Sequence, residues 1–209
     1  MNTVVLRNRY RVSRRLGAGG VGSVYRVRDL QASGHDGPEL ALKALFSRSG
    51  ERSLLESLRL EFRVLATLRH PLIARVYDFG SIPADSGLEG SDGRPGYFFT
   101  RDLIDGQDLE HHCAELSVRE ICQVVQRTAE VLDVLHRAGM IHGDFKPANV
   151  IVSPDGRPHL IDFGLVRSEG QSSVTSGTAA YIAPELLREQ LADRRADLYA
   201  LGISLFQLL

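Results

Sequence analysis

The residues best suited to catalysis lie in one short stretch, HGDFKPAN, at positions 142–149. Asp144 can accept a proton from a hydroxyl group, and Lys146 carries a positive charge two positions later. Asn149 offers a neutral oxygen ligand. An apolar run precedes the stretch, which is typical of a loop held rigid by its flanks. We interpret these positions as a candidate catalytic loop. Gly143, between His142 and Asp144, leaves open to which class of protein the loop belongs.

A second acidic motif, IDFGL at positions 161–165, follows two short β-like runs. Its Asp162 could bind Mg²⁺, an ion that prefers hard oxygen ligands shared with phosphates. The motifs GTAAYIAPE (177–185) and DLYALG (197–202) come later in the chain.

A glycine-rich motif, LGAGGVGSVY at positions 16–25, has the pattern G-x-G-x-x-G-x-V. Glycine has no Cβ, so backbone N–H groups there can approach phosphate oxygens closely. A dinucleotide-binding fold would need a helix directly after the glycines. Here the β-branched, alternating run SVYRVRDL predicts a strand instead, which disfavours the dinucleotide interpretation.

Lys43 lies inside the apolar run ALKAL at positions 41–45. Such a lysine is often only an exposed edge residue, but its ammonium could also point into a cleft and meet phosphates. That second interpretation requires a carboxylate to hold it. Glu61, on the helix predicted between residues 53 and 69, is the candidate.

Composition sets broad limits on the protein. The chain has 209 residues, 43% of them hydrophobic and 24% charged, enough for one sizeable domain or two small lobes. With 25 basic and 26 acidic residues, the net charge of −1 gives no electrostatic reason to expect nucleic acid or an anionic membrane as partner. No signal peptide or membrane-spanning run is apparent, and Cys113 and Cys122 are interpreted as reduced thiols, so we expect a cytoplasmic protein.

The predicted elements change character along the chain. Strands are expected at 9–17, 22–30, 39–46, 72–80 and 96–104, with the helix 53–69 among them and an exposed, mobile loop before the last strand. After residue 105 a long helix is expected from one apolar stripe, closed by Gly139, and a last helix starts near Ala196. The stripe consists of Val118, Ile121, Val125, Thr128, Leu132 and Leu135.

The order of the motifs resembles that of the eukaryotic-type (Hanks-type) serine/threonine protein kinases. The glycine loop, A-L-K, a helix glutamate, H-x-D-x-K-x-x-N, D-F-G and A-P-E follow one another as in that family. The resemblance covers about residues 10–209 and fits bacterial members. It implies an α+β, two-lobed fold: a β-rich N-lobe with one helix at about 8–102, a hinge at about 101–106, and a mainly helical C-lobe at about 107–209.

The resemblance implies transfer of the ATP γ-phosphate to serine or threonine hydroxyls of protein substrates, assisted by Mg²⁺. Asp144 would be the catalytic base, Lys146 would steady the γ-phosphate, and Lys43 would contact the α- and β-phosphates. Asn149 and Asp162 would hold the metal. The other residues implied to line the nucleotide site are Leu16, Gly17, Ala18, Gly19, Gly20, Gly22, Val24, Ala41, Glu61, Asp108 and Ile151. Lys146 and Thr178 match the serine/threonine members rather than the tyrosine kinases.

Three positions depart from the family's pattern. Gly143 replaces an arginine that normally reaches a phosphorylated residue in the activation loop, where Ser172, Ser173 and Thr175 are the candidates here. Arg101 or Thr100 falls at the back of the implied adenine pocket.

The third departure is the last helix, which ends where the family's C-lobe continues. We therefore expect an incomplete C-lobe, with Asp197 anchoring the catalytic loop and Ile203, Leu205 and Phe206 facing water.

Two alternatives remain open. Small-molecule phosphotransferases of the aminoglycoside and choline kinase type share the fold and often carry H-G-D, but they lack the A-P-E segment. The second alternative is a catalytically inactive, kinase-like binding module, which an incomplete C-lobe could produce even though Lys43, Asp144 and Asp162 are all retained.

Overall fold

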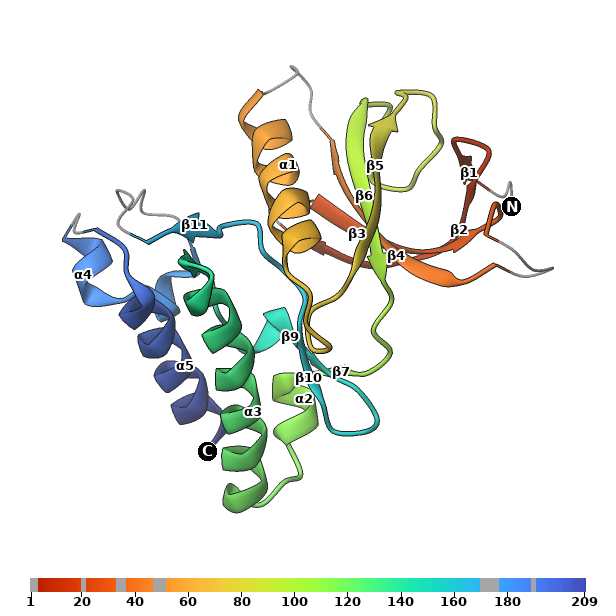
Figure 1. Ribbon diagram of the computed structural model, residues 1–209. Coiled ribbons are helices and arrows are strands. Elements are labelled where there is room, and N and C mark those ends of the chain that lie inside the picture. The colour runs from red at the N-terminus through yellow and green to blue at the C-terminus, as the bar shows by residue number, and fades with distance from the viewer. Residues whose placement is uncertain (1–3, 20–21, 33–36, 47–51, 170–176, 189–190) are drawn as a thin grey trace. The chain divides into compact units, whose positions relative to one another are not determined.

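Two compact units make up the protein, whose structure is a computed structural model (Figure 1). The structure describes residues 4–19, 22–32, 37–46, 52–169, 177–188 and 191–209. The first unit comprises Met1–Ala66 and Arg75–Leu103, and the second comprises Thr67–Ala74 and Ile104–Leu209. Strands dominate the first unit and helices the second, which confirms the predicted α+β class.

An antiparallel sheet forms the first unit, with its strands in the order β1-β2-β3-β4-β6-β5. The bounds are β1 (Val5–Leu6), β2 (Tyr10–Gly19), β3 (Gly22–Asp29), β4 (Glu39–Phe46), β5 (Val76–Ile82) and β6 (Gly96–Asp102). The five predicted strands are confirmed, although the one expected to begin at Leu72 begins at Val76. The residues just before it belong to the second unit, where Ile73 bridges to Leu160.

Alternating burial along β3 shows how the sheet makes its core. Tyr25 and Val27 are buried, while their neighbours along the strand are more exposed. They pack with Tyr10, Leu42 and Phe98 in one apolar cluster. The predicted helix is α1 (Arg52–Thr67), in which Leu58 and Leu65 are buried and Phe62 contacts the rings of Phe79 and Phe99.

The segment between β5 and β6 corrects one prediction. Its Gly, Ser and Asp content predicts an exposed loop, but Leu88 and Ser91 are each only 3% exposed. Leu88 joins the apolar cluster of the sheet, and the Tyr25 hydroxyl donates to the carbonyl of Glu89. Burial of Leu88 and the hydrogen bond from Tyr25 thus attach to the sheet a polar segment whose average composition indicates exposure.

A charged network joins three strands of the sheet. The Arg9 guanidinium donates to both oxygens of Asp29, at 2.9 and 2.8 Å, and to Asp78 at 3.4 Å. The Tyr10 hydroxyl also donates to Asp78 at 3.0 Å. Asp29 is buried, and its hydrogen bonds with Arg9 hold the pKa of this carboxyl below its usual range.

The second unit contains the longer helices and two small sheets. Its helices are α2 (Leu109–Cys113), α3 (Val118–Arg137), α4 (Pro184–Leu187) and α5 (Arg194–Leu208), with 3₁₀ turns η1 (Pro147–Asn149) and η2 (Ala179–Tyr181). Antiparallel strands β10-β9-β7 form one sheet and β11-β8 the other. Their bounds are β7 (Gln107–Asp108), β8 (Met140–Ile141), β9 (Val150–Val152), β10 (Pro158–Leu160) and β11 (Arg167–Ser168).

Helix α3 follows its predicted stripe with one exception. Its residues from Ile121 to Leu135 in the stripe are buried, but Val118, the first residue of the helix, is 62% exposed. Ser117 caps the helix in a capping box with Glu120. Gly139 ends it with a φ of 70°, as predicted. The helix packs against α5 and β10.

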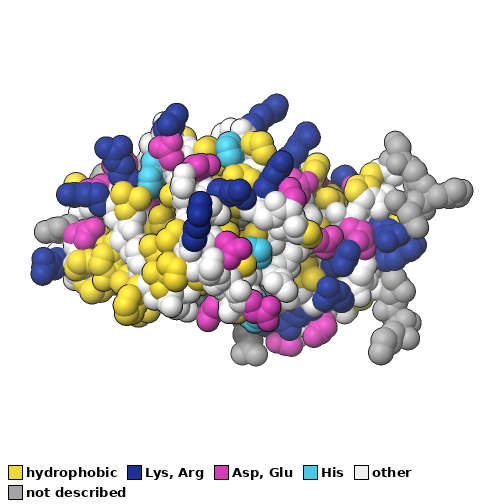
Figure 2. Space-filling view, turned by 90° about the horizontal axis from the view of Figure 1, so that it is seen from below, with side chains coloured by type: hydrophobic (Ala, Val, Ile, Leu, Met, Phe, Trp, Pro, Cys, Tyr) yellow, Lys and Arg dark blue, Asp and Glu magenta, His cyan; other side chains and the backbone are white. Residues whose placement is uncertain are grey.

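Helix α5 exposes apolar side chains. Phe206 is 83% exposed, as predicted. Ile203 and Leu205 are half-buried, so they are less exposed to water than expected. Leu198, Tyr199 and, on α4, Leu187 are also exposed. In Figure 2 hydrophobic side chains gather at the left of the view, the side on which α4 and α5 lie in Figure 1.

The Arg9–Asp29 pair provides a test of how the first unit is held together. We expect Asp29→Asn to lower the free energy of unfolding at pH 7 by about 1–3 kcal/mol, because the charge-assisted hydrogen bonds of a buried carboxylate to Arg9 are weakened. A carboxyl with a lowered folded-state pKa stabilises above its unfolded-state pKa of about 3.9, and this contribution is lost as the pH falls through the lower folded-state value. The difference between wild type and variant should therefore shrink on acidification, as urea denaturation at a series of pH values would show.

Asp92→Asn is the matched control for this measurement. Asp92 pairs with Arg94 at 2.8 Å, but its side chain is 68% exposed. An exposed pair contributes less than about 1 kcal/mol. Equal losses in the two variants would contradict the role given to Asp29.

Candidate active site

Lys43 and Glu61 form a buried ion pair inside the first unit. The Lys43 ammonium lies 2.8 and 2.7 Å from the two oxygens of Glu61, and the side chains are only 6% and 2% exposed. Lys43 comes from β4 and Glu61 from α1, so the helix faces this side of the sheet. Burial of both charges is tolerated because each satisfies the other. The structure thus brings together the two residues that the sequence pairs only by inference.

One face of the sheet carries two more of the nucleotide residues predicted in this unit, Val24 and Ala41. Val24 lies opposite Lys43, and Ala41 lies opposite Arg101, in registers that put all four side chains on the same face. Thr100 lies opposite Leu42 and therefore points to the other face. Arg101 is 5% exposed. Of the two residues that the sequence leaves open, Arg101 therefore lies on the same face of the sheet as Lys43, and Thr100 does not.

The glycine motif spans the end of β2 and the start of β3. Gly17 pairs with Val24, Ala18 with Ser23, and Gly19 with Gly22. A Cβ at Gly17 would meet nothing within 4 Å, so the backbone is open to an approaching group there. Leu16 is half-exposed, and Gly20 lies outside the described residues.

Asp144 is the centre of a hydrogen-bonded cluster in the second unit. Its Oδ1 accepts from the backbone N–H of Thr178 at 2.8 Å and from the Thr178 hydroxyl at 3.0 Å. Its Oδ2 accepts from the Lys146 ammonium at 2.9 Å, and Lys146 also donates to the Thr178 hydroxyl at 2.7 Å. The Asp144 side chain remains 17% exposed. The arrangement fixes a carboxylate that can still be reached and sets a cation beside it.

Asp197 anchors the backbone that carries Asp144. This carboxylate is 1% exposed and comes from the first turn of α5. Its oxygens accept from the backbone N–H groups of His142 at 2.8 Å and Gly143 at 2.9 Å, as predicted. His136 Nε2 lies 2.8 Å from the same carboxylate. Sequence reasoning missed His136, because a histidine in the last turn of a helix indicates no particular partner.

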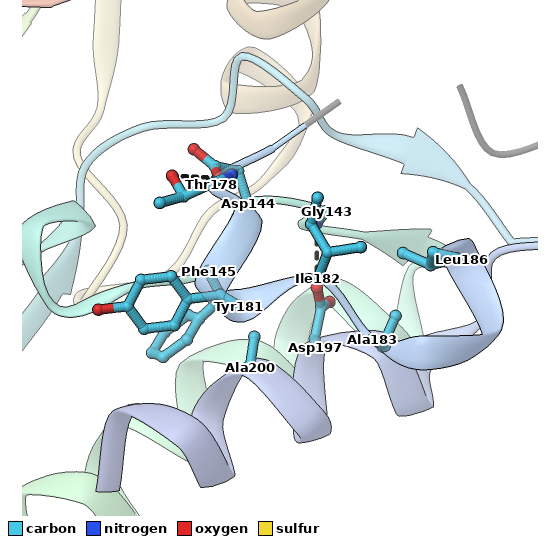
Figure 3. Close-up of a pocket in the computed structure, with 11 residues that line it drawn as sticks. Gly143, Asp144, Phe145, Thr178, Tyr181, Ile182, Ala183, Leu186, Asp197 and Ala200 are labelled. Carbon is cyan, nitrogen blue, oxygen red and sulfur yellow. Dashed lines mark hydrogen bonds between the residues drawn. The ribbon is translucent and has the colours of Figure 1, made fainter. Parts of the chain in front are cut away.

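A small pocket extends from Asp144 toward α5 (Figure 3). Figure 3 shows Thr178 beside Asp144, and Asp197 joined to Gly143 by a hydrogen bond. The pocket wall is mostly apolar. Its lining residues are Gly143, Asp144, Phe145, Thr178, Tyr181, Ile182, Ala183, Leu186, Ala196, Asp197 and Ala200.

Asn149 and Asp162 lie on segments that are bonded to each other. The Ile161 N–H donates to the Asn149 carbonyl at 3.0 Å, directly before Asp162. The Asn149 amide nitrogen donates to the Asp144 carbonyl at 2.8 Å, which commits the nitrogen and leaves the amide oxygen to face another group. Gly164 donates to Asp162 Oδ1 at 3.1 Å. One amide oxygen and one carboxylate are the hard ligands that suit Mg²⁺, so the donor set fits the predicted metal.

Asp108 and Ile151 are cross-strand neighbours. They lie directly opposite each other where β7 pairs with β9, although 42 other residues separate them in the chain. Asp108 also caps α2 by accepting from the His111 N–H at 2.9 Å. The His111 ring nitrogen Nδ1 lies 2.9 and 2.7 Å from the two carboxylate oxygens. His111 is another residue that sequence reasoning missed.

Gly143 has a backbone conformation that favours glycine. Its φ is 78°, and a Cβ there would lie 2.9 Å from the carbonyl oxygen of Leu165. The Arg167 guanidinium would lie 3.0 Å from the same Cβ. The sequence did not indicate Arg167. Its guanidinium occupies the space that a side chain at position 143 would need.

Comparison with known proteins gives the family. The protein kinase domain model matches residues 10–209. The serine/threonine-protein kinase PknL of Mycobacterium tuberculosis is 36% identical over 218 residues, which cover 100% of this chain and 51% of that protein. PknA of the same species is 34% identical over 209 residues, covering 96% of this chain and 46% of that protein. The probable serine/threonine-protein kinase pknA2 of Bifidobacterium longum is 31% identical over 217 residues.

The chain therefore belongs to the protein kinase family, as the order of its motifs indicated. Its similarity is to bacterial serine/threonine kinases of the Hanks type. The chain spans about half the length of the PknL and PknA relatives. Within the residues that the structure describes, no helix combines the length and apolar character needed to cross a membrane.

Gly143 allows a test of the backbone geometry of the candidate loop. We expect Gly143→Ala to lower the free energy of unfolding by about 2–4 kcal/mol, because a left-handed alanine is strained by about 1–2 kcal/mol and its Cβ also meets Leu165. Gly139→Ala is the matched control, since its φ is 70° but a Cβ there meets nothing within 4 Å. Chemical denaturation would compare the two. Equal losses would show that the close approach of Leu165 has no effect.

Proposed function

We propose that the chain transfers the γ-phosphate of ATP to serine or threonine hydroxyls of protein substrates. The observation that carries this proposal is the cluster of Asp144, Lys146 and Thr178, in which a reachable carboxylate is fixed by a lysine and a threonine. The family and the names of its relatives support the same activity. The segment after Gly177, which small-molecule phosphotransferases lack, contributes Thr178 to this cluster.

In this proposal Asp144 orients the substrate hydroxyl and accepts its proton. Phosphoryl transfer passes through a loose transition state, so positioning matters more than covalent chemistry. Lys146 lies beside Asp144 and would balance the negative charge that the γ-phosphate oxygens carry. Thr178 accepts a hydrogen bond from Lys146 and donates one to Asp144. This contact supports serine/threonine specificity, because Lys146 and Thr178 both match the serine/threonine members of the family.

We further propose an N-lobe at about 8–102, a hinge at about 101–106 and a C-lobe at about 107–209, and the following roles for their residues in binding ATP. Lys43, held by Glu61, would bind the α- and β-phosphates. Backbone N–H groups of the glycine motif would cover the phosphates, and Asp108 would meet the ribose. Apolar contacts to adenine would come from Val24, Ala41 and Ile151.

Asn149 and Asp162 would hold Mg²⁺ through an amide oxygen and a carboxylate. When bound, the ion would neutralise charge on the phosphates and fix their geometry. The residues of the chain orient these two ligands, because Asn149 is tied to Asp144 and Asp162 to the Gly164 N–H.

Nucleotide binding is the first test of the proposal. We expect saturating Mg²⁺-ATP, at about 100 times its dissociation constant, to stabilise the protein by about 2.7 kcal/mol, or roughly 5–10 °C in Tm. Removal of Mg²⁺ by a chelator, or Asp162→Ala, should abolish most of the shift. Asp155→Ala is the control, because this aspartate is exposed in the turn between β9 and β10. A full shift in the Asp162 variant would contradict the metal role.

The substrate class is tested in the same preparation. Labelled ATP is supplied with either a generic basic protein or a panel of small amines. Label on serine or threonine of the protein supports the proposal, and label on an amine would assign the chain to small-molecule phosphotransfer. Nucleotide binding without transfer to either would indicate a binding module.

Gly143 predicts how activity depends on phosphorylation. An uncharged residue there cannot bind a phosphate on Ser172, Ser173 or Thr175, which lie outside the described residues. We therefore expect phosphatase treatment to change the basal transfer rate less than about twofold, since the charge-assisted contact that an arginine at position 143 would make is missing. A rate assay before and after treatment measures this. A loss of tenfold or more would contradict the prediction.

A further inference from the structure

Asp108 lies where a bound nucleotide would present its sugar, if the proposed function is right. Its strand partner Ile151 is a proposed adenine contact, and side chains directly opposite each other in an antiparallel pair lie on the same face about 4.5–5.5 Å apart at Cβ. The backbone before Asp108 is pressed against β9, since a Cβ at Gly106 would lie 2.2 Å from the Val152 carbonyl oxygen. The backbone position of Asp108 is therefore fixed by the small sheet.

The side chain of Asp108 is fixed separately, by His111. The imidazole Nδ1 lies 2.9 and 2.7 Å from the two oxygens, and the His111 N–H donates to Oδ1 at 2.9 Å. Partial burial alone would raise the pKa of Asp108, but the hydrogen bonds from His111 outweigh it and lower that pKa. The same contact raises the pKa of His111. The two groups therefore favour an ionised pair.

The pair keeps acceptor sites for a ligand. An ionised carboxylate has about four acceptor sites, and the two donors of His111 use two or three of them. The Asp108 side chain is 35% exposed, so a hydroxyl can approach it. The imidazolium also offsets the charge of the carboxylate, which reduces its repulsion of an anionic nucleotide.

We propose that His111 is a positioning residue for nucleotide binding, which holds the Asp108 carboxylate in the orientation that accepts a ribose hydroxyl. The inference rests on the proposed function and adds to it the group that sets discrimination between ribose and deoxyribose. A side chain held in its binding orientation before the ligand arrives loses less entropy on binding. His111 therefore acts on affinity through Asp108, without touching the reacting phosphate.

Calorimetric titration of the whole chain with Mg²⁺-ATP, 2′-deoxy-ATP and 3′-deoxy-ATP tests this role. We expect His111→Ala to weaken ATP binding by about threefold to tenfold, the effect of one hydrogen bond. Binding of whichever deoxy analogue lacks the recognised hydroxyl should change less, so the ratio between analogue and ATP moves toward one. His111→Asn keeps a donor near the position of Nδ1 and should restore both the affinity and the ratio.

The matched control is His112→Ala, the neighbouring histidine on the same helix. It should leave affinity and ratio at the wild-type values, and thermal unfolding without nucleotide identifies any variant that fails to fold. Unchanged discrimination in a folded His111→Ala variant would overturn the inference while leaving the proposed function intact. A folded wild type that binds no ATP would overturn both. Failure of His111→Asn to restore the ratio would contradict the positioning role and leave the His111 side chain only a structural neighbour of Asp108, the N-cap of α2.

Discussion

The buried carboxylate of Asp197 is the constraint on which the candidate catalytic loop depends. A carboxylate that is 1% exposed must have its charge compensated by hydrogen bonds, and this one accepts from two consecutive backbone N–H groups and contacts His136. Two consecutive N–H groups can point at one carboxylate only where the backbone turns, which the positive φ of Gly143 permits. The position of Asp144, the next residue, follows from that turn.

Each reactive group of the second unit is held by a segment remote in sequence. Thr178 fixes Asp144 and Lys146, the Asn149 amide bonds to the backbone of Asp144, and Ile161 joins the Asn149 carbonyl just before Asp162. These bonds link the loop at 142–149, the motif at 161–165 and the segment after Gly177. Phosphoryl transfer depends more on positioning than on strong bases. These hydrogen bonds suit it, because they hold each side chain relative to the others.

The sequence predicts those residues whose chemical role few other residue types could fill. Lys43, Glu61, Asp144 and Asp197 could be named because their motifs occur in a fixed order, and the structure places their partners within hydrogen-bond distance. It does not predict contacts that arise only from folding. His136 meets Asp197 across 61 positions, and Leu88 is buried within a segment whose composition indicates exposure. Composition describes an average, whereas a few specific contacts decide whether a loop is attached to the sheet.

Arg101 and Arg167 show why departures from a motif need a structure. From the sequence, Arg101 could lie on either face of β6, and only its register opposite Ala41 puts it on the face of Lys43. Gly143 indicates a missing arginine, yet the Arg167 guanidinium occupies the space beside it. Substituting arginine at position 143 would therefore not recreate the usual family arrangement. A left-handed backbone, the Leu165 carbonyl and a second guanidinium would all oppose the new side chain. The glycine is consequently part of the packing around the loop as well as a change in its charge.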